Sequence, residues 1–86
     1  MKLDDRMLRL IAVGASITAN CQPCLQTNIK KARENGADEQ EIVEAVEVGK
    51  AVRRGAASKM DQFALSLNAA VTSSANAIDS GCECHA

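Results

Sequence analysis

Residues 20–25, with the sequence Asn-Cys-Gln-Pro-Cys-Leu, constrain the fold of this chain more than any other stretch. Pro23 has no amide hydrogen and is tolerated in a helix only within the first turn, so a helix should begin at or just before it. Cys21 and Cys24 are three residues apart, which places both on one face of that turn. Asn20 is a candidate cap or turn residue in front of them. The stretch therefore predicts a helix start that carries two neighbouring thiols.

The rest of the chain predicts an all-α fold, a small domain of about four helices. The expected helices cover residues 3–18, 22–35 and 39–53, followed by a fourth that begins near residue 58 or 61. Gly36 is the expected stop of the second helix and Gly55 the expected break after the third. Asp38 and Glu41 have the spacing of a capping box. The domain is expected to span residues 1–71, with a C-terminal tail over residues 72–86.

The expected core is built from small aliphatic side chains, because Phe63 is the only aromatic residue. Such a composition suits closely packed helices better than a sheet. A second apolar face on the first helix predicts two neighbours for it, one of which could be another subunit. The residues expected to face the core at helical spacing are Leu3, Met7, Leu10 and Ile11, then Leu25, Ile29 and Ala32, then Ile42, Val46 and Gly49, and finally Met60, Phe63, Ala64, Leu67 and Val71.

Charge and composition exclude some function classes. The net charge of −1 gives no basic field for nucleic acid, and the cluster formed by Lys50, Arg53 and Arg54 is read as a solvated helix end. The apolar run over residues 7–19 contains Arg9 and is too short to span a bilayer. A polar start argues against a signal peptide, so a cytoplasmic protein is expected. Cysteines in a reducing compartment are more often redox-active or metal-bound than structural.

The pair Cys21 and Cys24 is suited to dithiol chemistry. Unpaired amides at a helix start stabilise a thiolate, and thiols so placed have pKa values of about 3.5–7.5. Such a thiolate can attack a disulfide, or a peroxide to give a sulfenic acid, and the second thiol then resolves the product. This exchange requires no cofactor. Two other interpretations remain open, a buried pair of inert cysteines and half of a metal site.

The order of these features resembles the carboxymuconolactone decarboxylase-like family, and within it the alkylhydroperoxidase D type. A helix runs into Cys-x-x-Cys-Leu, an alanine-containing helix ends at Gly36, and an acidic helix start follows with Glu41 and Glu44. The resemblance covers about residues 3–67. It implies an all-α fold assembled as trimers or hexamers. It also implies peroxidase or disulfide reductase activity through the dithiol. The expected redox partner is a disulfide-bearing protein or a small thiol, and neither nucleic acid nor a membrane is expected as a partner.

The resemblance assigns roles residue by residue. Cys21 and Cys24 match the family's redox pair, in which the second cysteine is the usual peroxidatic residue. The family's His four residues after that cysteine corresponds to Asn28, and its Glu twelve residues before the first cysteine corresponds to Arg9. Asn28 cannot act as a base, and Arg9 could stabilise a thiolate but not relay a proton. Dithiol exchange is therefore favoured over peroxidase chemistry. On the residues alone Cys21, nearer the helix end and expected to be more exposed, is the better nucleophile, so the order of the two stays open.

The tail ends in Cys82-Glu83-Cys84-His85, which the resemblance does not include. In one interpretation the tail thiols exchange with Cys21 and Cys24, and His85 supplies a base. In a second, Cys82, Cys84 and His85 bind zinc or another soft metal, with or without the first pair as further ligands. In a third, the tail thiols have no role. A metal-binding module is thus the alternative to a thiol–disulfide oxidoreductase.

Overall fold

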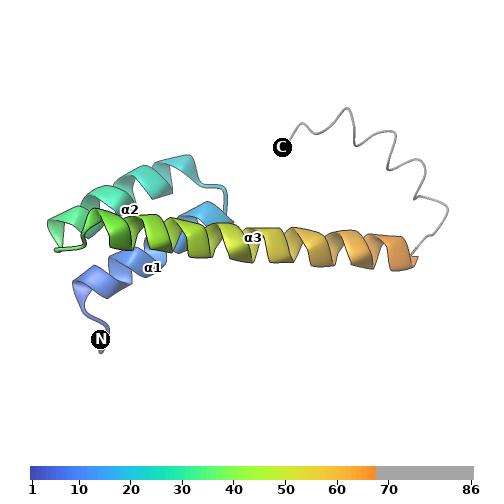
Figure 1. Ribbon diagram of the computed structural model, residues 1–86, viewed down its shortest axis with the longest axis horizontal. Coiled ribbons are helices and arrows are strands. Elements are labelled where there is room, and N and C mark those ends of the chain that lie inside the picture. Colours follow the sequence, from blue (N-terminus) through green and yellow to red (C-terminus); the bar gives the residue numbers. More distant parts are fainter. Residues whose placement is uncertain (68–86) are drawn as a thin grey trace. The chain divides into compact units, whose positions relative to one another are not determined.

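The computed structural model describes residues 1–67, which form three α-helices. They are α1 (Asp5–Thr18), α2 (Gln22–Glu34) and α3 (Glu39–Leu67). No strand occurs in this range, so the predicted all-α class is confirmed for it. The chain divides into two compact units, Met1–Ala56 and Ala57–Ala86. In the first unit α1, α2 and the first part of α3 pack against one another (Figure 1).

The connection between α2 and α3 is closed by two standard terminal motifs. Gly36 has a positive φ of 94°, and the amides of Gly36 and Ala37 donate to the carbonyls of Arg33 and Ala32 at 3.1 and 2.9 Å. This is the Schellman pattern, which a glycine after the helix end favours. Helix α3 then begins with the predicted capping box. The predicted stop at Gly36 is confirmed.

The capping box of α3 has both of its hydrogen bonds. The amide of Glu41 donates to Asp38 Oδ1 at 2.8 Å, and the amide of Asp38 donates to Glu41 Oε1 at 3.1 Å. Each bond satisfies an amide that has no partner within the helix. Helix α1 is capped similarly, because Asp4 Oδ1 accepts from the amide of Met7 at 2.8 Å.

The core of the first unit is small and aliphatic. The predicted core faces of α2 and of the start of α3 are confirmed, since these residues are buried or packed on the core. The prediction for α1 is partly wrong: Leu10 is buried, whereas Leu3, Met7 and Ile11 are 46, 38 and 53% exposed. The buried face of α1 is instead centred near Val13. The buried core residues are Leu10, Val13, Ala32, Ala37 and Ile42, with Leu25, Ile29, Ala45 and Val46 packed against them.

Helices α1 and α3 meet backbone to backbone at two glycines. A Cβ atom on Gly14 would lie 3.1 Å from the carbonyl oxygen of Ala45, and one on Gly49 would lie 2.9 Å from Ile17 Cβ and against the Gly14 backbone. The hydroxyl of Thr18 lies 3.1 Å from the carbonyl oxygen of Gly49 and 3.2 Å from that of Gly14. The absence of side chains at these two positions is what lets the helices approach so closely.

Helix α3 continues through Gly55, so the predicted break there is wrong and the count of about four helices is not confirmed within residues 1–67. A glycine inside a helix costs only about 1 kcal/mol relative to alanine, and the arginines and alanines around it favour the helix. Without a proline or a turn motif, that cost does not end a helix. Met60 and Phe63, predicted to face the core, are 64 and 59% exposed, and Leu67 is 69% exposed. The predicted boundary at residue 71 lies outside the described residues.

A shallow apolar groove runs between α1 and α3 in the first unit, with a volume of about 420 Å³. Its floor contains the two glycines, and several of its walls are exposed aliphatic side chains. The groove is lined by Met7, Leu10, Ile11, Gly14, Ala15 and Thr18 of α1 and by Ala45, Val48, Gly49 and Val52 of α3.

None of the described helices is long and apolar enough to cross a membrane.

Candidate functional site

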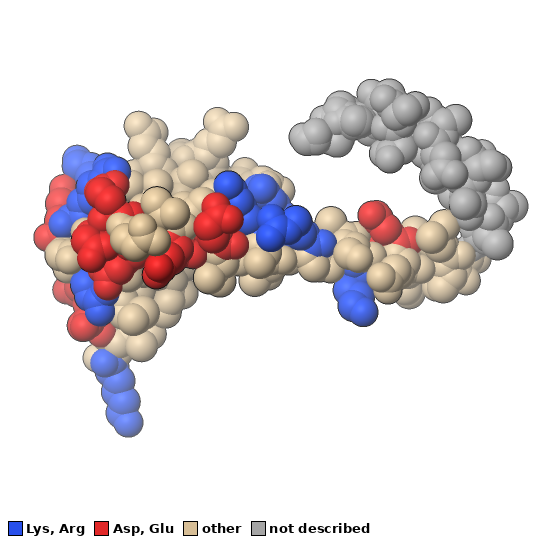
Figure 2. Space-filling model, in the orientation of Figure 1, with Lys and Arg blue, Asp and Glu red and all other residues tan. Residues whose placement is uncertain are grey.

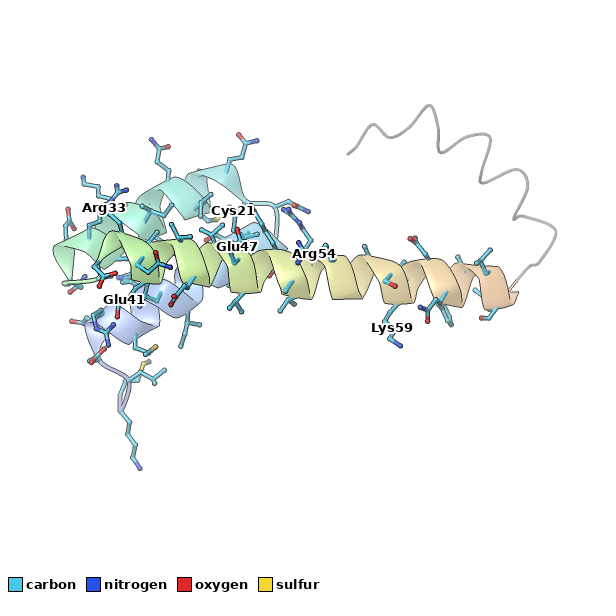
Figure 3. All side chains as sticks on the ribbon, in the orientation of Figure 1. Cys21, Arg33, Glu41, Glu47, Arg54 and Lys59 are labelled. Carbon is cyan, nitrogen blue, oxygen red and sulfur yellow. A yellow bond between two sulfur atoms is a disulfide. The ribbon has the colours of Figure 1, made fainter. Side chains whose placement is uncertain are left out.

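The two cysteines lie at the N-terminus of α2, as the sequence predicts. Cys21 is the N-cap of this helix, in an extended backbone conformation, and Pro23 occupies the first turn. The carbonyl of Cys21 accepts the first helical hydrogen bond, from the amide of Leu25 at 3.0 Å. Its Sγ accepts from the amide of Cys24 at 3.3 Å, in the position that a serine or aspartate oxygen commonly takes. Cys21 is therefore both the N-cap of α2 and one half of the Cys-x-x-Cys pair (Figure 3).

Cys21 and Cys24 form a disulfide, with their Cα atoms 5.3 Å apart. The side chains differ in access to solvent: Cys24 is exposed, whereas Cys21 is half-buried. The expectation that Cys21 is the more exposed of the two is wrong. The reason is local, because Cys21 lies in the turn that follows α1, and its amide donates to the carbonyl of Ser16 at 3.0 Å.

Asn28, at the position where the family has a histidine, contacts the pair through the helix backbone. Its Nδ2 donates to the carbonyl of Cys24 at 2.9 Å and to Ser16 Oγ at 3.4 Å. Its Oδ1 accepts from Arg9 Nη1 at 3.2 Å. Because a guanidinium can only donate, this contact fixes which end of the amide faces Arg9. The two predicted supporting residues thus lie together, one helical turn beyond the disulfide.

Ser16 is a part of this network that the sequence reading missed. It is 5% exposed, and its hydroxyl donates to the carbonyl of Ala12 at 2.7 Å while accepting from Asn28. A buried hydroxyl needs such partners, because leaving it unsatisfied would cost about 1–3 kcal/mol. The signal was visible as a hydroxyl seven residues after Arg9, that is, two turns further along the same helix.

Arg53 of α3 holds the turn that precedes the disulfide. Its Nη1 donates to the carbonyl of Ile17 at 3.2 Å and to Asn20 Oδ1 at 2.9 Å. Asn20 has a left-handed backbone with φ of 56°, which asparagine tolerates better than most residues, and its amide donates to the carbonyl of Ile17. Asn20 is thus a turn residue rather than the cap. The prediction that Arg53 belongs to a merely solvated helix end is wrong, because its cation binds the carbonyl of Ile17 near the end of α1 and the side-chain oxygen of Asn20 in the turn that follows.

The charges of the first unit are unevenly distributed. In Figure 2 most of the visible acidic side chains gather where α2 ends and α3 begins, the opposite end of α2 from Cys21. There Arg33 donates to both carboxylate oxygens of Glu39, at 2.6 and 3.0 Å. The hydrogen bond from Arg33 lowers the pKa of Glu39, and the same bond raises the pKa of Arg33. A second ion pair joins Arg6 of α1 to Glu41 of α3.

The tail residues Cys82, Cys84 and His85 lie outside the described residues, so their assignment as shuttle or metal ligands stays a prediction. Within residues 1–67, no group of three or more His, Cys, Asp and Glu side chains is placed to hold a metal ion. What the described residues bring together is a dithiol pair at a helix start, with one amide, one hydroxyl and one guanidinium behind it. None of these three groups is an ordinary proton carrier near neutral pH.

Comparison with known proteins identifies the family of the chain. The model of the carboxymuconolactone decarboxylase family matches residues 1–68. Over 55 residues the chain is 40% identical to a Paracoccus denitrificans protein described as uncharacterized protein 4 in the cox locus. The match covers 64% of this chain and 50% of that relative, so the chain spans about half the relative's length. No solved structure matches the chain. With more than half of its residues matched, the chain belongs to the carboxymuconolactone decarboxylase family.

Proposed function

We propose that the protein is a thiol–disulfide oxidoreductase that uses Cys21 and Cys24. The observation that carries the proposal is the position of the pair, with the exposed Cys24 one turn into α2 and Cys21 as the N-cap that accepts the amide of Cys24. On reduction this amide stabilises a thiolate at Cys21, and the positive end of the helix dipole favours a thiolate at either cysteine. Such a dithiol works in a reducing compartment, for which we propose the cytoplasm.

The exchange proceeds in two steps, with Cys24 as the residue that meets the substrate. The Cys24 thiolate attacks a substrate disulfide, a bond forms between Cys24 and one substrate sulfur, and the other sulfur leaves as a thiolate. Cys21 then attacks Cys24 Sγ, which closes the protein disulfide and releases the first sulfur as a second thiolate. The substrate gains two electrons and the protein pair loses two. Exposure supports this order, since the half-buried Cys21 is better placed to resolve than to attack.

Hydroperoxide reduction is proposed only as a weak side activity. Attack of Cys24 on a peroxide gives a sulfenic acid and an alkoxide or hydroxide, which needs a proton as it leaves. At the positions of the family's histidine and glutamate this chain has Asn28 and Arg9, which bond each other. The Nδ2 group of Asn28 already donates to Ser16 Oγ and to the Cys24 carbonyl. Disulfide exchange has no such requirement, because its leaving groups are thiolates.

Two single substitutions test the proposal and the order of attack. With a small disulfide as substrate, reduced Cys21→Ser should accumulate a mixed disulfide on Cys24, because no thiol is left to resolve it. Reduced Cys24→Ser should form little adduct, because the remaining thiol is half-buried. Trypsin releases residues 10–30 as one peptide carrying only this pair of cysteines, so mass spectrometry separates the pair from the tail thiols. Equal adduct on both variants would contradict the order, and unreactive thiols with an ordinary pKa near about 8.5 would contradict the function.

We also propose that the protein is a homo-oligomer, a trimer or hexamer, assembled through the groove between α1 and α3. The groove is apolar, and Ile11, Val48 and Val52 on its walls are 53, 63 and 54% exposed. Contiguous apolar surface of this kind is typical of protein interfaces. Val48→Glu should lower the mass measured by analytical ultracentrifugation. Val43→Glu is the matched control, since Val43 lies on the same helix, is 51% exposed and does not line the groove. A wild-type monomer at high concentration would refute this proposal.

A further inference from the structure

Arg9 is a half-buried cation beside the dithiol whose charge no carboxylate balances within residues 1–67. The ion pairs of this range involve Arg6, Arg33 and Lys50 instead. The hydrogen bond that Arg9 makes is to the neutral amide of Asn28, through one of its five N–H groups. Asn28, one helical turn after the exposed Cys24, in turn donates to the Cys24 carbonyl, so two successive hydrogen bonds link the guanidinium to the backbone of Cys24.

A second guanidinium, that of Arg53, contacts the turn directly before the pair. Arg53 binds Asn20 Oδ1, one residue before Cys21, and the carbonyl of Ile17, both of which are neutral. The acidic residue of α3 nearest to it in sequence, Glu47, is paired with Lys50 at 3.3 Å. The first turn of α2 adds the positive end of its dipole at the pair itself. Two cations thus contact the residues directly before and one turn after the dithiol, Asn20 and Asn28, while most acidic side chains of the view lie at the far end of α2 (Figure 2).

We propose that this site selects small thiols that carry a carboxylate near the sulfur, with Arg9 as the residue that binds the carboxylate and Arg53 adding to the positive field. The proposal rests on the dithiol function proposed above and names the class of its electron donor. A guanidinium suits a carboxylate because its planar N–H groups can donate two parallel hydrogen bonds. Arg9 has such groups left after its contact with Asn28.

The donor reduces the oxidised protein in two balanced steps. A donor thiolate attacks the exposed Cys24 Sγ, a bond forms between the two sulfurs, and the Cys21–Cys24 bond breaks with its electron pair leaving on Cys21. A second donor thiolate attacks the donor sulfur of this mixed disulfide, which releases Cys24 and the disulfide of the donor. Two donor thiolates are oxidised and the protein disulfide is reduced. During the first step the donor carboxylate lies beside Arg9.

The test compares three small thiols that differ in charge, each used to reduce the full oxidised chain. Mercaptopropionate is anionic, mercaptoethanol neutral and cysteamine cationic. Reduction is stopped by acid and alkylation, and the state of the pair is read by mass spectrometry of the tryptic peptide over residues 10–30. In Arg9→Gln, where trypsin no longer cleaves after residue 9, the peptide is residues 7–30. For each thiol the rate of a variant is divided by the wild-type rate, which cancels the intrinsic reactivity of that thiol. The variants are Arg9→Gln, Arg9→Lys and the control Lys31→Gln.

For Arg9→Gln we expect the mercaptopropionate rate to fall about fivefold relative to the mercaptoethanol rate, with the cysteamine rate unchanged or raised, the effect of a partly exposed charge pair. Arg9→Lys should retain part of the selectivity. Lys31→Gln removes a positive charge seven residues after Cys24, about 10 Å along α2 and close to the screening length, and should leave all ratios unchanged. Equal factors for the three thiols in Arg9→Gln would overturn the selectivity and leave the dithiol function standing. If none of the thiols reduces the pair, the proposed function itself fails.

Discussion

The two glycines of α3, Gly49 and Gly55, have different surroundings and so provide a direct test of the helix packing. Replacing either by alanine gains up to about 1 kcal/mol of helix propensity. At Gly55 nothing lies within 4 Å of the new Cβ, so this gain should be realised. At Gly49 the Cβ would lie 2.9 Å from Ile17 Cβ and against the backbone of Gly14, which cannot rotate away as a side chain could. The two helices must then separate.

Overpacking of this kind costs about 1–3 kcal/mol, and obstruction by backbone places Gly49→Ala at the upper end. Subtracting the propensity gain leaves a net loss of about 2 kcal/mol. For a domain of this size that corresponds to a Tm lowered by about 10 °C, whereas Gly55→Ala should raise it by about 4 °C. The assay is thermal and urea unfolding followed by helical circular dichroism, at one protein concentration because assembly shifts Tm. A Gly49→Ala variant as stable as Gly55→Ala would refute the close contact between α1 and α3.

Three further predictions concern single features. Asp38→Ala removes one bond of the capping box and should lower the free energy of unfolding by about 1 kcal/mol, measured by urea denaturation. Arg33 lowers the pKa of Glu39, so this pair stabilises the fold above the unfolded pKa of about 4.3 and loses that effect as pH falls through the lower folded value. The difference in stability between wild type and Arg33→Gln should therefore shrink on acidification, and a difference that grows would contradict the pairing. If the tail binds metal, the reduced full chain should take up zinc, and Cys82→Ser and Cys84→Ser should each abolish this uptake. If the tail does not bind metal, metal analysis of the reduced full chain should show no zinc.

The local signals in the sequence predicted the helix ends well, because each depends on a few adjacent residues. Pro23 marked the start of α2, Gly36 its end, and Asp38 with Glu41 the start of α3. Gly55 was misread because a helix break needs more than the modest propensity cost of one glycine. The stability of a helix depends on the propensities of all its residues together, so the cost of one glycine does not decide where the helix ends.

The site was predicted at the level of its cysteines and of Arg9 and Asn28, but not in its geometry. The contact between Arg9 and Asn28 joins positions nineteen residues apart, and the family resemblance placed both near the pair without showing that they bond. The contacts of Ser16 and Arg53 depend on how α1 meets α2 and α3, which no local pattern contains. For the same reason the relative exposure of the two cysteines was predicted wrongly, since the turn after α1 decides it.

The capping sulfur of Cys21 ties the oxidation state of the pair to the local opening of α2. A disulfide sulfur is a weak acceptor for the first-turn amide of Cys24, whereas a thiolate in the same place is a charged one. By linkage, if the helix start stabilises the thiolate, the thiolate stabilises the helix start by the same free energy. Reduction should therefore slow the fraying of the first turn, and hydrogen exchange of its amides becomes a readout of the redox state even when no substrate is present.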